Sequence, residues 1–315
     1  MFIKIMEDDM KKVLLATEKP FAPKAVIEIE SIFGKADYEL VKLESYGDVS
    51  EFKEAVKDVH GLIIRSDKVT KDIMEGAPEL KIVIRGGAGY DNVDCAVATE
   101  KGVTVMNTPG QNSNAVAELA MGMAVYAARN LFTPKAGTEL LGKKIGIHAY
   151  GNVGKLVARI AKGFGMEVYA FDPFLEKSAI ETDGVKAVDS AEELYSTCNY
   201  ISLHIPANDK TKKSINKKLL SLMPEGATLI NTARKEVVCE DSLKMVLAAR
   251  PDFKYLSDIA PVTAEELVKE FPGKVFFTPK KMGAQTKEAN INAARAAAQQ
   301  IVDFFEKGDI TFKVN

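Results

Sequence analysis

The segment IGIHAYGNVGKLVARIAKGFGMEVYAFD, Ile145–Asp172, decides the fold. It contains an apolar run, a turn with two glycines, a helical pattern and a second apolar run that ends in an acid. Within it, Ala149-Tyr150-Gly151-Asn152-Val153-Gly154 matches the dinucleotide fingerprint G-x-G-x-x-G, with alanine at the first glycine. Strand, turn, helix and strand in this order are typical of a βαβ unit. The segment therefore predicts a parallel sheet that binds a dinucleotide.

Each part of the fingerprint has a physical purpose. Gly151 lets the backbone approach a pyrophosphate, and Gly154 lets the helix pack closely on the strand. The N–H groups that open the helix, around Tyr150, Asn152 and Val153, offer hydrogen bonds and the positive end of the helix dipole to phosphates. Asp172 lies 18 residues after Gly154, and its carboxylate favours NAD over NADP because it would repel a 2′-phosphate.

Ala149 is the one departure from the fingerprint. Alanine at this position costs little if its backbone dihedral angles are ordinary. It strains the turn if the position needs a positive φ angle, which glycine adopts readily and alanine does not.

Similar strand patterns recur along the chain. In the first third, strands are predicted at Lys11–Thr17, Glu39–Leu43, Gly61–Ile64, Lys81–Arg85 and Gly102–Asn107, with a helix at Val49–Asp58. A second series is predicted at Lys144–His148, Glu167–Phe171, Tyr200–His204, Thr228–Asn231, Lys254–Ser257 and Val275–Thr278. Strands that alternate with helices predict parallel sheets covered on both faces, so the fold class is α/β with two doubly wound, Rossmann-like or flavodoxin-like domains.

Two long helices mark the organisation of these domains. The pattern at Asn112–Leu131 is small or apolar on nearly every face, which predicts a helix buried between domains or in a subunit interface. The pattern at Thr286–Phe305 closes the chain and is expected to pack on the first sheet. The expected domains are residues 1–108 with 285–315, which bind substrate, and residues 109–284, which bind the cofactor.

Composition limits the classes of function. The chain has 315 residues, 46% of them hydrophobic, and a net charge of −2, so no overall field recruits nucleic acid or membrane. Its three cysteines have no metal-ligand spacing, which predicts no metal site and a reducing, cytoplasmic compartment. The start, MFIKIMEDDMKK, is broken by acids and is not expected to be a signal peptide.

Four further motifs, in order along the chain, resemble those of the D-2-hydroxyacid dehydrogenases. They are RGGAGYDNVD from Arg85, NTPGQNSNAVAELAMGM from Asn107, YISLHIPANDKTKKSIN from Tyr200 and LINTARKEVV from Leu229. The resemblance covers nearly the whole chain. It implies two Rossmann-like domains, a homodimer built on the long buried helix, and a chain that lacks the C-terminal regulatory domain of larger members.

The resemblance also implies roles for individual residues. Arg234 would hold the substrate carboxylate and polarise the ketone, which suits a guanidinium fork. Backbone N–H groups of Gly87, Ala88 and Gly89 could grip the same carboxylate. Arg65 and Ser66 favour the branch of the family whose small hydroxy or keto acids carry a phosphate. Further contacts to NAD are expected at His204, Thr232, Ala233 and Asp258.

The proton donor departs from the family pattern. The family has a histidine after T-P and a glutamate paired with it, but the histidines here are His60, His148 and His204, all earlier in the chain. The loop FFTPKKMGAQT, Phe276–Thr286, places Lys281 at the histidine, with Lys280 as an extra residue that could bind substrate, and the register is ambiguous by one. Because an unperturbed lysine has a pKa of about 10.4, it suits proton donation to an alkoxide and predicts an alkaline optimum for oxidation.

The glutamate position carries Thr263, with Glu265 and Glu266 close behind, while Asp258 keeps its place in the catalytic set. The joint loss of histidine and glutamate leaves three functions open. The protein is an NAD-dependent dehydrogenase for a phosphorylated acid, a reductase for glyoxylate, hydroxypyruvate or lactate, or a non-catalytic NAD-binding interaction protein. Replacement of Arg65 separates the first two, because it should weaken only a phosphorylated substrate.

Overall fold

The computed structural model describes residues 10–315 and divides the chain into two compact units. Unit 1 comprises the residues up to Asn112 together with Thr286–Asn315, and unit 2 comprises Ser113–Gln285. The sequence placed the two borders at 108/109 and 284/285, within a few residues of these positions. The expectation about a signal peptide concerns residues that lie mostly outside the described part of the chain.

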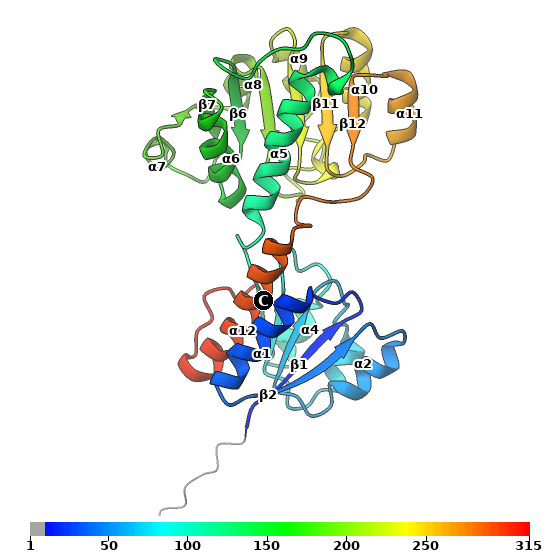
Figure 1. Cartoon of the computed structure of the whole chain (residues 1–315), viewed down its shortest axis with the longest axis vertical. Coiled ribbons are helices and arrows are strands. Elements are labelled where there is room, and N and C mark those ends of the chain that lie inside the picture. Colours follow the sequence, from blue (N-terminus) through cyan, green and yellow to red (C-terminus); the bar gives the residue numbers. More distant parts are fainter. Residues whose placement is uncertain (1–9) are drawn as a thin grey trace, which may run out of the picture. The chain divides into compact units, whose positions relative to one another are not determined.

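Unit 1 contains a parallel sheet of five strands in the order β2-β1-β3-β4-β5, of which β1 and β2 are labelled in Figure 1. The strands are β1 (Lys12–Thr17), β2 (Glu39–Glu44), β3 (Gly61–Ile64), β4 (Ile82–Arg85) and β5 (Thr104–Asn107). This is the flavodoxin-like order, which reverses between β1 and β3. Segments that follow β1 and β3 therefore lie at the position where such sheets bind ligands.

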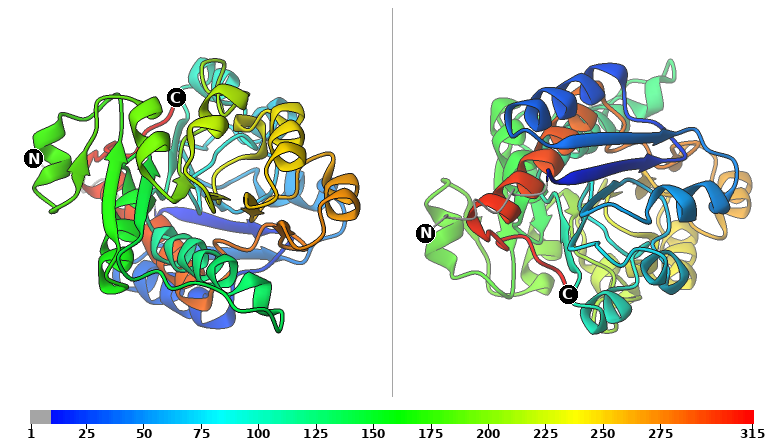
Figure 2. Two further views of the ribbon diagram at one scale, coloured as in Figure 1. Left: turned by 90° about the horizontal axis from the view of Figure 1, so that it is seen from above. Right: turned by 90° about the horizontal axis from the view of Figure 1, so that it is seen from below.

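Alternate side chains of these strands are buried under the helices that cover the two faces of the sheet. Val13 and Leu15 pack with α1 (Pro23–Lys35) and α12 (Lys287–Lys307), while Leu14 and Ala16 face the other core. The right view of Figure 2 shows α1 and α12 side by side. The opposite face is covered by α2 (Val49–Ala55), α3 (Lys71–Glu75) and α4 (Cys95–Glu100).

Unit 2 contains a parallel sheet of seven strands in the order β12-β11-β10-β9-β6-β7-β8. The strands are β6 (Lys144–His148), β7 (Glu167–Phe171), β8 (Lys186–Ala187), β9 (Tyr200–Leu203), β10 (Thr228–Asn231), β11 (Lys254–Ser257) and β12 (Val275–Phe277). The order reverses between β6 and β9, as in the Rossmann fold. The short strand β8 was not predicted from the sequence.

The helices of unit 2 again cover both faces of its sheet. On one face, α5 (Ser113–Ala128) and α6 (Asn152–Gly163) lie together over the strands (Figure 1). The other face carries α8 (Ala191–Thr197), α9 (Lys217–Leu222), α10 (Glu240–Ala249) and α11 (Ala264–Glu270). The remaining helices are α7 (Lys177–Glu181) and the short turns η1 (Asn130–Phe132) and η2 (Lys235–Val237). The small side chains of α5 let it lie close to α6 and β10, which explains its nearly uniform apolar composition.

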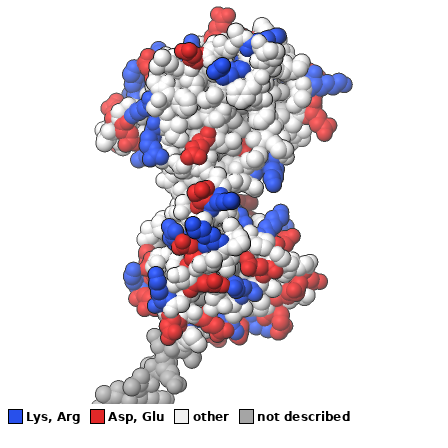
Figure 3. All heavy atoms as spheres, viewed as in Figure 1, with Lys and Arg blue, Asp and Glu red and all other residues white. Residues whose placement is uncertain are grey.

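The prediction of two α/β domains with parallel sheets is confirmed. On the face shown in Figure 3, basic and acidic side chains are interspersed over both units, in keeping with the small net charge. Among residues 10–315, no helix combines the length and the apolar character needed to cross a bilayer.

Candidate active site

The fingerprint turn joins β6 to α6 at the point where the sheet order of unit 2 reverses. Gly151 is the N-cap of α6, and no side chain caps this end of the helix. The first N–H groups of a helix have no partner within the helix, so here they remain available to an anion. The turn thus fits the pyrophosphate of a dinucleotide.

Ala149 adopts a φ of 80°, which puts it in the left-handed region of backbone conformation. The first position of the fingerprint therefore does need the conformation that glycine supplies. An L-residue in this region is strained by about 1–2 kcal/mol. The turn keeps its shape because the Ala149 N–H donates to the Phe171 carbonyl at 2.9 Å and because the surrounding sheet is buried.

Replacing Ala149 by glycine is expected to raise the free energy of unfolding by about 0.5–1 kcal/mol, because relief of strain outweighs the extra freedom that glycine gives the unfolded chain. Urea unfolding followed by circular dichroism measures the change. Ala260 is exposed and has no positive φ, so Ala260→Gly is the matched control and should lower the free energy of unfolding. Equal losses in both variants would contradict the strain at Ala149.

The two glycines of the turn are needed for different reasons. A Cβ atom added to Gly154 would lie 2.5 Å from the Ala149 carbonyl oxygen and 3.0 Å from Ile147. At Gly151 an added Cβ atom would meet no protein atom within 4 Å, and φ is −83°. Gly154 thus serves packing of helix on strand, whereas the space beside Gly151 is open to a ligand.

Gly151→Ala is expected to leave the melting temperature nearly unchanged and to weaken NADH binding about tenfold or more, because its methyl group occupies the approach of the pyrophosphate. Gly154→Ala should instead lower stability by about 1–3 kcal/mol through overpacking. Thermal unfolding and titration with NADH, followed by cofactor fluorescence, measure the two effects. Undiminished NADH binding by Gly151→Ala would contradict the assigned phosphate site.

Asp172 follows β7 and lies beside the turn. One carboxylate oxygen accepts the Tyr150 N–H at 2.9 Å, and the other accepts the Phe174 N–H at 2.9 Å. Each oxygen keeps a lone pair, so the carboxylate can still accept bonds from ribose hydroxyls. These two bonds fix the acid next to the phosphate loop, as its spacing in the sequence predicts.

His204 follows β9, the strand next to β6. Its N–H donates to the His148 carbonyl at 3.0 Å, and its Nε2 lies 2.9 Å from the Ser202 hydroxyl. Burial, and after it the neighbouring His148, lowers the pKa of His204 to about 3, while burial lowers that of His148 to about 4. Both imidazoles are therefore neutral at pH 7, and His204 lies beside the fingerprint turn, where contact with a cofactor was predicted.

Arg234 lies in the loop after β10 and is positioned by Asn231. The Asn231 side chain donates to the Arg234 carbonyl at 3.0 Å and accepts the Ala233 N–H at 3.0 Å. The Arg234 Nη1 donates to the Ala233 carbonyl at 2.9 Å. The hydroxyl of Thr232 is buried and has no partner within residues 10–315, which leaves it able to bond a ligand. The loop thus presents a half-buried guanidinium on a fixed backbone.

Lys280 and Lys281 are both exposed, in the loop that follows β12. The loop is attached to Asp258, which is buried at the end of β11 and accepts N–H bonds from Met282 and Gly283. Arg234, Asp258 and the two lysines therefore follow three adjacent strands of one sheet.

Thr263, the residue at the position of the family glutamate, has neither Glu265 nor Glu266 as its hydrogen-bond partner. Glu266 pairs with Lys244, and Glu265 is exposed. Instead Thr263 bonds to Glu240, a residue that the sequence analysis missed. The Glu240 carboxylate accepts the Thr263 hydroxyl at 2.7 Å and the N–H groups of Val262 and Thr263 at 2.9 and 3.0 Å.

Burial acts to raise the pKa of Glu240, but the bonds from Thr263 and Val262 outweigh it and hold that pKa below its ordinary value. The bonded carboxylate secures the loop before α11 to the start of α10. Because Glu240 is 23 residues from Thr263 in the chain, no local sequence motif indicates that the two side chains are bonded.

Arg65 lies in unit 1, directly after β3 and next to the reversal of strand order. Its Nη1 donates to the carbonyls of Lys19 and Pro20 at 3.2 and 2.9 Å, and its guanidinium lies 4.9 Å from the centre of the Phe21 ring. Burial lowers the pKa of Arg65. The guanidinium is thus held over the segment after β1, and the exposed Ser66 follows it.

Asp67 is not an ion-pair partner for the Arg65 guanidinium. Its carboxylate accepts the Glu18 N–H at 2.6 Å, the Tyr46 hydroxyl at 2.8 Å and the Arg65 backbone N–H at 3.2 Å. These bonds fix the turn. The guanidinium of Arg65 itself contacts the Lys19–Phe21 segment.

The glycine loop after β4 supplies fewer donors than the sequence predicts. The Gly87 N–H donates to the Arg85 carbonyl at 2.8 Å, so it is already used. The carbonyls of Gly87 and Ala88 accept bonds from Thr108 and Asn107 at 3.0 and 2.6 Å, which hold the loop against the end of β5. The N–H groups of Ala88 and Gly89 remain as the candidate donors to a carboxylate.

Comparison with known proteins bears on both units. Residues 114–279 match the D-isomer specific 2-hydroxyacid dehydrogenase NAD binding domain. A curated D-3-phosphoglycerate dehydrogenase of Methanocaldococcus jannaschii is 36% identical over 82% of this chain and 54% of its own length. A hydroxypyruvate reductase of Thermotoga maritima is 38% identical over 65% of this chain and 70% of its own length.

Among solved structures, a cofactor(NAD+)-bound 3-phosphoglycerate dehydrogenase of Entamoeba histolytica is 42% identical, with a TM-score of 0.86. The similarity covers 97% of this chain and 99% of that one. The chain spans about half the length of most of the curated relatives named D-3-phosphoglycerate dehydrogenase that it matches.

The turn, the acid and the sheet order define a dinucleotide-binding α/β protein. This chain belongs to the D-isomer-specific 2-hydroxyacid dehydrogenases, a family of NAD-dependent oxidoreductases. The family and the NAD cofactor predicted from the sequence are confirmed.

Proposed function

We propose that this protein is a D-3-phosphoglycerate dehydrogenase, which interconverts 3-phosphoglycerate and 3-phosphohydroxypyruvate with NAD in the synthesis of L-serine. The observation that carries this choice of substrate is Arg65, held at the strand reversal of unit 1 with Ser66 beside it. A guanidinium at this position suits a phosphate. The names of relatives similar over most of this chain support the same substrate.

The residues present fit NAD, as the uncapped start of α6, the open space at Gly151 and the carboxylate of Asp172 indicate. When bound there, NAD supplies or accepts the hydride. In reduction, Arg234 holds the substrate carboxylate and stabilises the negative charge that develops on the ketone oxygen. Lys281 donates a proton to that oxygen and becomes a neutral amine, which completes the alcohol. In oxidation the amine must first be neutral, so the rate rises with pH.

Replacement of Arg65 tests the choice of substrate. Arg65→Ala is expected to raise KM for 3-phosphohydroxypyruvate by about 100-fold and to change KM for hydroxypyruvate by less than about threefold, because a charged hydrogen bond is lost only with the phosphate. Initial rates of NADH oxidation with both ketones measure the contrast. Equal losses on both substrates would contradict a phosphate site at Arg65, and a wild-type preference for hydroxypyruvate would favour the second candidate, a hydroxypyruvate reductase.

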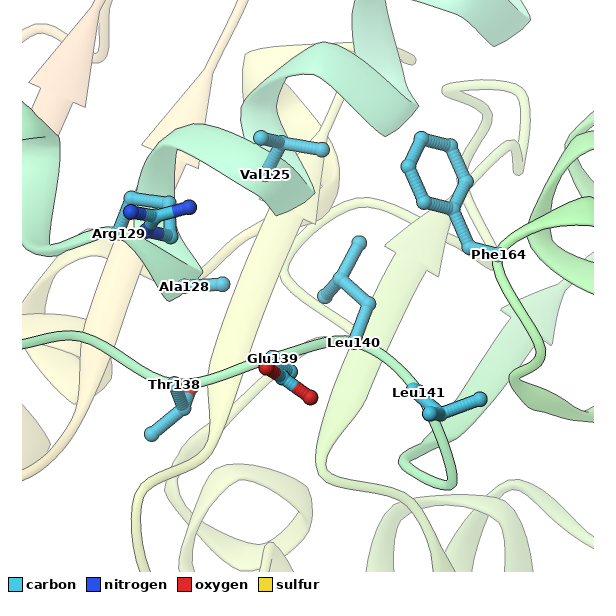
Figure 4. Close-up of a pocket in the computed structure, with 8 residues that line it drawn as sticks. All are labelled: Val125, Ala128, Arg129, Thr138, Glu139, Leu140, Leu141 and Phe164. Atoms are coloured by element: carbon cyan, nitrogen blue, oxygen red, sulfur yellow. The ribbon is translucent and has the colours of Figure 1, made fainter.

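A homodimer is the assembly we propose, formed through the end of α5. Three consecutive residues after α5, Asn130–Phe132, have φ angles between 51° and 55°, and they turn Phe132 outward, 69% exposed. Beside them lies an open pocket of about 270 Å³ (Figure 4). It is lined by Val125, Ala128, Arg129, Thr138, Glu139, Leu140, Leu141 and Phe164.

This pocket is distinct from the cofactor site, because Phe164 is at the opposite end of α6 from the fingerprint turn, about 18 Å along the helix. Arg129 and Glu139 give the apolar pocket one charge of each sign. In a two-fold dimer, Arg129 of each copy can pair with Glu139 of the other. Sedimentation velocity tests the assembly. A monomer for wild type at micromolar concentration would contradict it.

The compartment we propose is the cytoplasm. The thiols of Cys95, Cys198 and Cys239 are free, which suits a reducing environment. Fractionation of cells that express the whole protein tests this location, and recovery from an oxidising compartment would contradict it.

A further inference from the structure

The loop that carries Lys280 and Lys281, Thr278–Gln285, is bound to one buried carboxylate. We name this segment the lysine loop. Oδ1 of Asp258 accepts the Met282 N–H at 2.7 Å, and Oδ2 accepts the Gly283 N–H at 2.8 Å. The Thr278 hydroxyl lies 2.7 Å from the Asp258 carbonyl oxygen, 2.8 Å from the Lys280 carbonyl oxygen and 3.0 Å from Oδ1. Two successive N–H groups thus grip both oxygens of a side chain that is only 1% exposed.

These two hydrogen bonds require the backbone at Gly283 to lie close to the Asp258 carboxylate. A Cβ atom added to Gly283 would lie 3.0 Å from the Asp258 Oδ2 and 3.3 Å from Val116. Glycine therefore lets the backbone of the lysine loop reach the carboxylate without displacing it. Hydrogen bonds to an ionised group in a buried setting are about twice as strong as neutral ones, so this is the strongest visible attachment of the lysine loop.

The same network fixes the Arg234 loop. The Asp258 N–H donates to the Asn231 carbonyl at 2.9 Å, and the Ser257 hydroxyl lies 3.1 Å from that carbonyl. The Asn231 side chain in turn bonds the backbone of Ala233 and Arg234. One hydrogen-bonded network therefore runs from the Arg234 loop through Asn231 and Asp258 to the lysine loop, all within unit 2.

We propose that Asp258 is a positioning residue, whose carboxylate sets the lysine loop, and with it the proton donor, at a fixed distance from Arg234. This role rests on the proposed dehydrogenase function. A lysine side chain is long and flexible, so a lysine donor needs a backbone that is held in one place. The bonds to Asp258 hold the backbone of the lysine loop.

Asp258→Asn separates this role from simple burial of a polar group. The amide has the same shape as the carboxylate, but its nitrogen cannot accept a hydrogen bond, so either Met282 or Gly283 loses its acceptor. A misplaced donor reduces turnover more than binding, and a shift of about 1 Å can cost about 100-fold. We expect kcat for reduction to fall about 30- to 100-fold, while KM for the keto acid changes less than about threefold.

The test combines amide hydrogen exchange with kinetics on the full chain. In wild type, the Met282 and Gly283 amides should exchange slowly, and in Asp258→Asn at least one should exchange about tenfold faster or more. Thr278→Val, which removes only the hydroxyl, should lower kcat several-fold, and Thr278→Ser, which keeps it, should restore kcat. These two variants keep the proposal testable if Asp258→Asn does not fold.

Asp252→Asn is the matched control, because the Asp252 carboxylate also holds a loop of unit 2, through the Gly226 N–H at 2.8 Å. It should lower the melting temperature and leave kcat unchanged. Faster exchange in Asp258→Asn with unchanged kcat would overturn the positioning role. Slow exchange in that variant would overturn the attachment itself, whatever the activity. A wild-type protein inactive on every keto acid would overturn the proposed function, and the positioning role with it.

Discussion

Lys281→Ala is expected to lower kcat for ketone reduction by about 100- to 10,000-fold, the usual contribution of a general acid. No histidine follows His204 in the chain, and Lys281 is exposed on a loop attached to the end of β11, the strand next to the one that precedes Arg234. NADH affinity should not change, because the phosphate loop is untouched. Stopped-flow measurement of NADH oxidation gives the chemical step directly.

Lys280→Ala is the matched control, since the two lysines are adjacent and both exposed. It should raise KM for the anionic substrate and change kcat by less than about fivefold. The reverse result would move the donor to Lys280. Full turnover by the double variant would contradict a lysine donor, and water would then deliver the proton.

The pH dependence follows from the charge that the donor must carry. Reduction needs the protonated ammonium, so its rate should stay level through neutral pH and fall only at alkaline pH, where lysines lose their proton. Oxidation needs the neutral amine and should rise over the same range. A fall in reduction between pH 6 and 7, as an ordinary histidine donor would give, is not expected.

Arg234→Ala is expected to lower kcat/KM for the keto acid by about 1,000-fold or more. Two effects are lost together, the bidentate hold on the carboxylate and the stabilisation of charge on the ketone oxygen. Arg234→Lys keeps the charge without the planar fork and should recover only part of the loss. Initial rates across substrate concentrations, with NADH affinity measured separately, give the result.

Arg250→Ala provides the structural comparison. Arg250 lies in the same unit, and its guanidinium bonds the carbonyls of Met223 and Pro224 at 2.7 and 2.6 Å and pairs with Asp252. Its loss should lower the melting temperature without changing kcat/KM. Equal kinetic losses from Arg234→Ala and Arg250→Ala would show that the effect at Arg234 is general destabilisation.

The parts of the fold visible in the sequence are those set by short-range pattern. Strand β3 has the predicted bounds, and α12 begins one residue after its predicted start. The fingerprint turn and Asp172 could be found because glycine spacing and an acid at the strand end are local requirements. The two-residue strand β8 was missed because it is too short to show any periodicity.

The contacts that connect distant segments could not be predicted. The sequence shows that the cost of alanine at position 149 depends on its φ angle, but only the structure gives the value of that angle, 80°. The bond from Thr263 to Glu240 spans 23 residues, and the attachment of Met282 to Asp258 spans 24. Such pairs depend on which loops meet at the edge of a sheet, and strand order decides that.

NADH oxidation by the purified protein with 3-phosphohydroxypyruvate, beside hydroxypyruvate, glyoxylate and pyruvate, tests the central claim most directly. The chain has no tryptophan, so cofactor absorbance is the suitable signal. A kcat/KM for the phosphorylated ketone at least about 100-fold above the others is the predicted result, since one charged phosphate contact distinguishes them. NADH binding without turnover on any of the four would contradict the proposed activity and identify the protein as an NAD-binding member of the family that no longer catalyses its reaction.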